Sequence, residues 1–267
     1  MANSDSLKEW YAVNRKCLSQ VQDIKLFIDS FVKTHSKTRK RNFLISILVR
    51  LSSNLCSIAL LSKYMVINRK PVLLKFPVGL LLRNCFMDAL LGLYICDKDE
   101  NHVAEITEVL HADYVNALFN QFEVYRDNVG DGGLDDGVLE HMYTMAIEDN
   151  YLEYLEPNKD PIEVEVGHER DIWRVTPRKK IRTLIPEKKV TNELNIKSMW
   201  EYLKERENYA ECASFLFSYY KYFSQYEHFS ESSFGDATVS LDVDHVNLVK
   251  AVERLSESIG VIQQELI

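Results

Sequence analysis

Glycine and proline are scarce in this chain, with nine and six residues respectively among 267. All-β and dinucleotide-binding proteins need many turns, and turns depend on these two residue types. Four of the nine glycines lie in one short stretch, 127–137, which leaves few for the rest of the chain. The low turn content and the many Leu, Glu and Lys residues predict a mainly α protein, built as a multi-helix bundle.

Paired cysteines and a secretory signal are also missing. The first ten residues, MANSDSLKEW, lack the basic start and apolar stretch of such a signal. No Cys-x-x-Cys occurs, and the apolar surroundings of most cysteines predict buried, reduced thiols in a cytoplasmic protein. The net charge of −8 argues against broad electrostatic capture of nucleic acid or of an anionic membrane. The five cysteines are Cys17, Cys56, Cys85, Cys96 and Cys212.

The familiar catalytic motifs are absent from the sequence. It contains no GxSxG, Walker loop, GxGxxG, HExxH or zinc-type Cys/His spacing. This argues against P-loop nucleotide hydrolysis and zinc-dependent hydrolysis. The acidic stretch 127–137 does not fit the EF-hand spacing, so we interpret it as a solvated loop. The sequence predicts no metal and no cofactor, and leaves open whether the protein is an enzyme.

What the sequence does contain is helical periodicity. The two most apolar segments, 40–67 and 78–96, are separated by a connector that Pro71 and Pro77 bracket. They predict an antiparallel hairpin at the centre of one helical domain over 1–267. We expect further helices over 5–33, 101–127, 138–156, 192–230 and 242–266, the last as a C-terminal packing helix.

Two heptad seams stand at the ends of the chain, over 7–31 and 248–266. The first contains Asn14, and a single buried Asn often fixes the register of a helix pair. We expect the seams to pack inside the protein's own bundle, with homo-oligomerisation through them as the alternative. The seam residues are Leu7, Trp10, Asn14, Cys17, Val21, Ile24, Ile28 and Phe31, then Leu248, Val252, Leu255, Ile259, Ile262 and Leu266.

The segment 43–61 is about as apolar as a membrane span, and Lys37–Arg41 places a basic flank before it. Against a span, four polar residues recur at spacings of 4, 3 and 4 and share one stripe of a helix. A bundle core supplies polar partners for such groups, whereas lipid does not. We therefore expect a core helix, with membrane association as the alternative. The four residues are Ser46, Arg50, Ser53 and Ser57.

The periodicity changes between 157 and 190. IEVEV (162–166) alternates as a strand does, and Pro161, Pro177 and Pro186 interrupt the segment. We expect an extended arm or a small β-hairpin inserted into the helical domain. Its basic residues over 170–189 either neutralise the acidic helix before it or form a patch that binds RNA or DNA.

One polar constellation is a candidate active site. Tyr220, Ser224 and His228 are spaced four apart and share one helix face, where the histidine would either titrate near neutrality or be a core histidine with its hydrogen bonds satisfied. Arg83 and Asp88 are the only charges in an apolar helix, and their spacing of five turns them about 140° apart. Each must find a partner elsewhere. With Arg50 they predict one interhelical polar cluster around the histidine.

Two segments resemble a family of uncharacterised bacterial all-helical proteins. The segments are LLRNCFMDALLGLYI (81–95) and YYKYFSQYEHFS (219–230), which pair an apolar Arg-plus-acid helix with a Tyr-x-x-x-Ser-x-x-x-His helix. That family looks distantly similar to the HEPN-type helical bundles of toxin and phage-defence systems. This chain departs from it, because the family's acid is usually a Glu four after its Arg. The Arg-x-x-x-x-His motif of ribonuclease HEPN proteins is also absent here.

Three functions follow as expectations. The first is a non-catalytic helical interaction or regulatory protein, favoured by the missing catalytic motifs. The second, which the resemblance implies, is a metal-independent ribonuclease or phage-defence effector. His228 would be its general base, Arg83 or Arg50 would stabilise a pentavalent phosphate, and Tyr220 or Ser224 would position substrate. The third is membrane association through 43–61.

Overall fold

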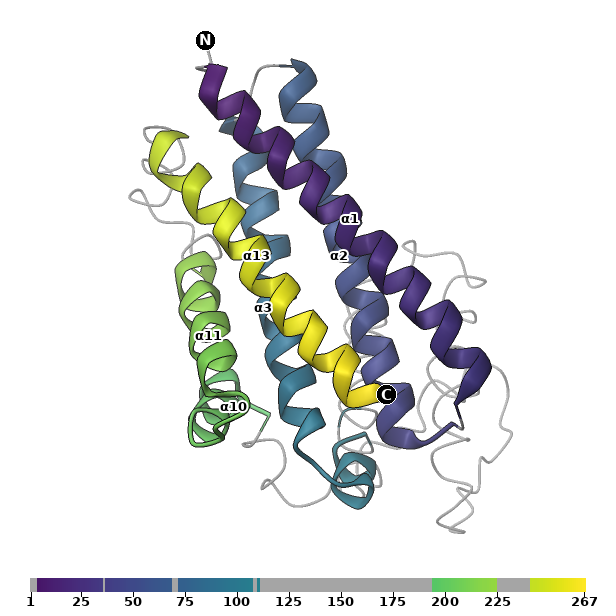
Figure 1. Ribbon diagram of the computed structural model, residues 1–267. Coiled ribbons are helices and arrows are strands. Elements are labelled where there is room, and N and C mark those ends of the chain that lie inside the picture. Colours follow the sequence, from purple (N-terminus) through teal and green to yellow (C-terminus); the bar gives the residue numbers. More distant parts are fainter. Residues whose placement is uncertain (1–3, 36, 69–71, 108–109, 111–193, 225–240) are drawn as a thin grey trace, which may run out of the picture. The chain divides into compact units, whose positions relative to one another are not determined.

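The computed structural model describes residues 4–35, 37–68, 72–107, 110, 194–224 and 241–267. The chain divides into two compact units, residues 1–104 with 192–267, and residues 105–191. The first, which we call the helical unit, contains the helices labelled in Figure 1. The prediction of a mainly α helical bundle is confirmed, and no strand occurs among the residues described. The helices are α1 (Ser4–Thr34), α2 (Arg39–Asn68), α3 (Val72–Cys96), α10 (Ile196–Leu203), α11 (Ala210–Ser224) and α13 (Leu241–Leu266).

The apolar hairpin predicted at the centre is formed by α2 and α3. Lys40 contacts Cys96 and Arg50 contacts Asp88, so the two helices run antiparallel. Helix α3 packs against α2, α10, α11 and α13, which makes it the central element of the helical unit (Figure 1). Helix α2 lies to one side, mainly against α1 and α3.

The connector between these two helices is shorter than the prolines predicted. Pro71 precedes α3, but Pro77 lies within it rather than in a loop. A proline that close to a helix start removes one backbone hydrogen bond, a local cost that the packing of the following turns outweighs. The helix therefore begins before Pro77, at Val72.

Both heptad seams are used within the helical unit. Helix α1 packs against α2 and α13, and all six seam residues of α13 are buried. Asn14 Nδ2 donates a buried hydrogen bond of 2.7 Å to the carbonyl oxygen of Ala59 in α2, which fixes the register of this helix pair. The expected packing inside the bundle is confirmed. Homo-oligomerisation through the two seams stays a prediction.

The helix predicted over 192–230 is interrupted, which the sequence did not indicate. Helix α10 starts after Asn195, whose side chain accepts from the Lys197 N–H at 2.9 Å. It ends at Leu203, and α11 begins at Ala210. The intervening residues include Arg206, which pairs with Asp97, and Tyr209, which donates to Glu265. These contacts with residues distant in the sequence stabilise the interruption of the helix.

Two helices are long and apolar enough to cross a membrane, α2 and the Pro77–Cys96 part of α3. They differ in burial, because 67% of the most apolar window of α3 is buried but only 39% of that of α2. The predicted serine stripe of α2 faces outward rather than into the core. Ser46 and Ser57 bond to carbonyls of their own helix, whereas Arg50 reaches a carboxylate of α3.

Several predicted features fall outside the described residues. They include the arm over 157–190 with its basic residues over 170–189, the helix over 138–156, and His228. Of the helix predicted over 101–127, residues 101–107 and 110 are described and are helical. Helix α13 covers the segment 242–266 that was predicted as a C-terminal helix.

Candidate functional site

Arg83 connects α3 to α11. Its Nε donates to Ser224 Oγ at 3.3 Å and its Nη2 donates to Tyr220 OH at 3.2 Å. The guanidinium carbon also lies 5.0 Å from the centre of the Tyr220 ring, a cation–π distance. Ser224 Oγ in turn donates to the Tyr220 carbonyl at 2.7 Å. The arginine therefore meets two of the three members of the predicted Tyr-x-x-x-Ser-x-x-x-His face.

Aromatic packing positions this contact. Phe86 of α3 stacks on Tyr219 and Phe223 of α11, with ring centres 5.3 and 5.8 Å apart. Phe86 and Phe223 are buried, so α11 is anchored on α3 through its aromatic face. Arg83 and Tyr220 border that anchor.

Arg50 and Asp88 form a separate pair. Arg50 Nη2 lies 2.8 Å from Asp88 Oδ1, and the exposures of the two side chains are 58% and 1%. Asp88 Oδ2 is buried and has no hydrogen-bond partner within the described part of the chain. Burial raises the pKa of the Asp88 carboxyl from its ordinary 3.8 to about 6, and the Arg50 charge offsets only part of that rise.

The structure therefore places the six candidates as follows. Arg83 and Asp88 each find a partner on another helix, as their angular separation on α3 predicted. Arg83 joins Tyr220 and Ser224, while Asp88 joins Arg50. The contacts described thus form two sets on different faces of α3 rather than one cluster. His228, which was to unite them, lies outside the described residues.

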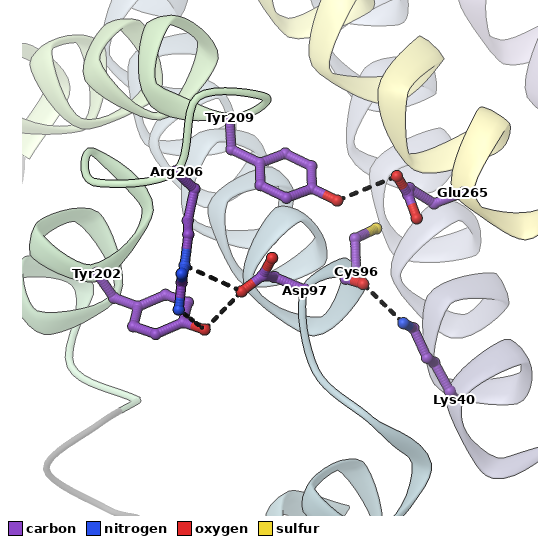
Figure 2. Close-up of polar contacts among 7 residues, drawn as sticks. All are labelled: Lys40, Cys96, Asp97, Tyr202, Arg206, Tyr209 and Glu265. Carbon is purple, nitrogen blue, oxygen red and sulfur yellow. Dashed lines mark hydrogen bonds and ion pairs between the residues drawn. The ribbon is translucent and has the colours of Figure 1, made fainter.

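A second polar site, at the end of α3, was not predicted. We call it the α3 junction; Figure 2 shows Asp97 at its centre, facing Tyr202 and Arg206. Tyr202 O–H donates to Asp97 Oδ2 at 2.5 Å, and Arg206 Nε lies 3.3 Å from the same oxygen. Arg206 Nη2 donates to Tyr202 OH at 2.9 Å, which closes a triangle. The junction consists of Lys40, Cys96, Asp97, Tyr202, Arg206, Tyr209 and Glu265.

The other side of the α3 junction joins α2 and α13 to the same helix end. Lys40 Nζ donates to the carbonyl oxygens of Cys96 at 2.6 Å and Lys98 at 2.8 Å, where the helix dipole favours a cation. Tyr209 O–H donates to Glu265 Oε1 at 3.1 Å (Figure 2). Burial and the Glu265 carboxylate raise the pKa of Tyr209, so its phenol stays protonated.

The chemistry of the α3 junction is that of a clamp. The Tyr202 hydroxyl both donates and accepts, and Asp97 Oδ2 is shared by two donors, so these groups are engaged with one another. In the sequence, Asp97 lies shortly before residues 105–191 and Tyr202 lies shortly after them. The contact between Asp97 and Tyr202 therefore joins the two parts of the helical unit that flank those residues in the sequence.

The sequence contains two local patterns at this junction. Tyr202 and Arg206 are spaced i, i+4, the spacing of side-chain neighbours on a helix. The run Asp97-Lys98-Asp99-Glu100 follows the apolar segment 78–96. Neither pattern shows that the two segments meet across a sequence separation of 105 residues.

The cysteines are free, as predicted, and three of them are buried. Burial raises the pKa of the Cys17 and Cys96 thiols to about 12, and that of Cys85 well above its ordinary range. A thiol that stays protonated is a poor nucleophile. The burial of these three thiols is typical of cysteines that pack in a core.

Replacing Tyr202 by phenylalanine is expected to lower the free energy of unfolding by about 1–2 kcal/mol, because it removes the hydroxyl shared by Asp97 and Arg206. Urea denaturation measures the change. Tyr64→Phe, on the exposed side of α2, is the matched control and should leave the midpoint unchanged. Equal midpoints for both variants and the wild type would show that the clamp contributes nothing to stability.

Comparisons with protein-family models, with curated proteins and with solved structures give no match to this chain. The account of function therefore depends on the contacts and exposed surfaces described above.

Proposed function

We propose that the protein is a non-catalytic helical interaction or regulatory protein, which binds another protein chain through the outward side of α2. The observation that carries this proposal is the exposure of large apolar side chains there. Leu60, Tyr64 and Ile67 are 63%, 57% and 67% exposed. The α2 outer face, as we call it, consists of Ser46, Arg50, Ser53, Ser57, Leu60, Tyr64 and Ile67.

The opposite side of α2 explains why this face would be a good binding surface. Leu48, Leu51, Leu55 and Ile58 are fully buried, so the helix is held rigidly by the core. A rigid helix loses little conformational freedom when a partner binds. Exposed apolar side chains gathered on one face, with a tyrosine among them, are typical of protein interaction sites.

The polar contacts between helices support a non-catalytic role. Asp88 is engaged by Arg50, and Arg83 by two hydroxyls of α11, so each contact links two helices. A buried carboxylate such as Asp88 needs a partner of this kind for the fold alone. The α3 junction, likewise, engages its charges within the helical unit.

Photo-crosslinking in the cell tests the proposal. A photoreactive phenylalanine analogue placed at Tyr64 is expected to form adducts with a specific protein. The same analogue at Tyr11 in α1 is the matched control, because Tyr11 is 55% exposed but lies on another helix. Adducts at 64 and not at 11 support the proposal, and equal adduct formation at both positions, or none at 64, contradicts it.

A second candidate function is a HEPN-like metal-independent ribonuclease or phage-defence effector. The contact of Arg83 with Tyr220 and Ser224 favours it, since it gathers a cation and two hydroxyls on the face that His228 would continue. A guanidinium there suits a phosphate diester. This geometry favours Arg83 over Arg50 as the phosphate ligand, because Arg50 is paired with Asp88.

The ribonuclease candidate predicts that His228→Ala and Arg83→Lys each abolish RNA cleavage while helicity and melting temperature stay unchanged. The matched control is Lys221→Ala, an exposed change on the same helix, which should cleave as the wild type does. A purified wild-type protein that cleaves no RNA, or a His228→Ala variant that retains full cleavage, would exclude this candidate.

A further inference from the structure

The α2 outer face is complementary to itself, and we infer that its partner is a second copy of this chain, bound with α2 antiparallel to α2 about a two-fold axis at Ser57. This inference rests on the proposed function and names the partner for the same surface. It differs from the predicted association through the terminal heptad seams, because it uses the outward side of a helix whose core side is already packed.

The spacing of the face is that of a coiled-coil seam. Its seven residues follow one another at intervals of 4, 3, 4, 3, 4 and 3, an average of 3.5 residues. A stripe with that period stays in contact with a partner helix along its length when the two helices supercoil to the left. Six of the seven positions are exposed and Ser57 is half-buried, so the seam is uncovered within the helical unit.

The order of side-chain sizes along the seam makes it self-complementary. An antiparallel partner centred on Ser57 places Ser46 within one residue of the level of Ile67 of the second copy, and Ser53 within one residue of the level of its Leu60. Leu60 and Ile67 then each lie beside a serine, so that large side chains of one copy face small ones of the other. At the axis two serines face each other, which allows the helices to approach closely.

The same arrangement places Arg50 opposite Tyr64 of the second copy. Both side chains are more than half exposed, at 58% and 57%. A guanidinium over a tyrosine ring is an attractive contact. Arg50 keeps its ion pair with Asp88 and presents the exposed part of its guanidinium to the tyrosine ring.

Charge favours the antiparallel orientation over the parallel one. Helix α2 contains five basic residues and no acidic one, so a parallel pair would align like charges along its whole length. With a rise of about 1.5 Å per residue, the antiparallel pair separates Lys63 from its copy by about 18 Å and Lys40 from its copy by about 51 Å. Both separations exceed the screening length of about 8 Å at physiological salt. Lys63 comes within one residue of the level of Arg50 of the second copy, whose charge is partly neutralised by its ion pair with Asp88.

A single helix pair is a small interface, so the dimer should be weak, with a dissociation constant in the micromolar range, on the order of 1–100 μM.

Disulfide trapping in the full chain tests the geometry of the dimer. In a background with Cys56 and Cys212 replaced by alanine, Ser57→Cys should form a disulfide-linked dimer under mild oxidation, because position 57 faces itself. Ser53→Cys is the matched control, since the two copies of position 53 would lie about 12 Å apart along the axis.

Sedimentation velocity of the full chain over a range of concentrations is the second test of the dimer. Leu60→Glu should weaken dimerisation at least about 100-fold, since it buries a charge against Ser53 of the other copy. Leu26→Glu changes a comparably exposed leucine of α1, 59% against 63%, and should leave dimerisation unchanged. Both variants should keep the wild-type melting temperature.

The inference is overturned by a wild-type protein that stays monomeric at all concentrations, by equal trapping at positions 53 and 57, or by equal weakening in the two glutamate variants. Pelleting of the monomer with phosphatidylserine-containing vesicles, lost in Leu60→Glu, would overturn it in favour of a lipid surface. Crosslinks from position 64 to a different protein would overturn the self-pairing while leaving the proposed function intact. An absence of crosslinks from that position would remove both.

Discussion

Replacing Gly92 by leucine is expected to lower the free energy of unfolding by about 3 kcal/mol. Gly92 lies in α3 where that helix meets α13 and α2. A Cβ atom at this position would lie 2.5 Å from Ile262 Cδ1 and 3.5 Å from Ile47 Cγ2. Ile262 is fully buried, so a leucine at 92 would force α13 away from α3.

Alanine at the same position separates crowding from helix propensity. The atom closest to a Cβ at Gly92 is the flexible tip of Ile262, which needs to move only slightly. Alanine also favours a helix by about 1 kcal/mol over glycine, so Gly92→Ala should be nearly neutral. Chemical denaturation of both variants measures the difference.

A double-mutant cycle identifies the cause. Ile262→Ala alone leaves a cavity and should itself cost about 2–5 kcal/mol. If the crowding between Gly92 and Ile262 is responsible, leucine at 92 fills that cavity, and the combined cost falls well below the sum of the single costs. Additive costs would mean that α3 and α13 do not approach each other closely at this point.

Replacing Asp88 by asparagine is expected to raise the free energy of unfolding at pH 7.5, by up to about 3 kcal/mol. Burial raises the pKa of this carboxyl from 3.8 to about 6, so ionising it in the folded protein is unfavourable. Asparagine has the shape of the neutral acid and removes that cost. The exposed side of Arg50 lets its charge stay hydrated after the pair is lost.

The pH dependence of the free energy of unfolding shows whether Asp88 is the cause. Because the folded carboxyl binds its proton more tightly than the unfolded one, the wild type loses stability as the pH rises from about 4 to about 6, and the loss then levels off. The Asp88→Asn variant should lack this decline and match the wild type near pH 3.5. Asp23→Asn, an exposed change on α1, should retain it. A decline of equal size in all three proteins would show that Asp88 is not its source.

Much of the helical unit could be predicted because its helices carry strong periodic patterns. The bounds of α1, α2 and α13 lie within one or two residues of those predicted from the heptads and the apolar runs. Local proline rules misplaced the start of α3, because its later turns pack against four helices and stabilise the proline-containing start. The break between α10 and α11 depends on contacts of Arg206 and Tyr209 with distant residues, which no local pattern contains.

The polar sites were predictable only in part, for a geometric reason. The angle between Arg83 and Asp88 on one helix follows from the helical repeat, so their need for separate partners could be predicted. Which partners they meet depends on how α2 and α11 pack on α3. The outward side of α2 was predicted wrongly, because the polar stripe of Ser46, Arg50, Ser53 and Ser57 was expected to face partners in the core, whereas it lies on the outer side of the helix.

The claim at the centre of this account is that the α2 outer face is covered by a protein partner in the cell. Hydroxyl-radical footprinting tests it most directly, by comparing two tyrosines of nearly equal exposure, Tyr64 in α2 and Tyr11 in α1. In the purified protein at high dilution both should be oxidised at similar rates. In cells, Tyr64 should be protected several-fold while Tyr11 remains reactive, and equal reactivity of the two tyrosines in cells would contradict the account.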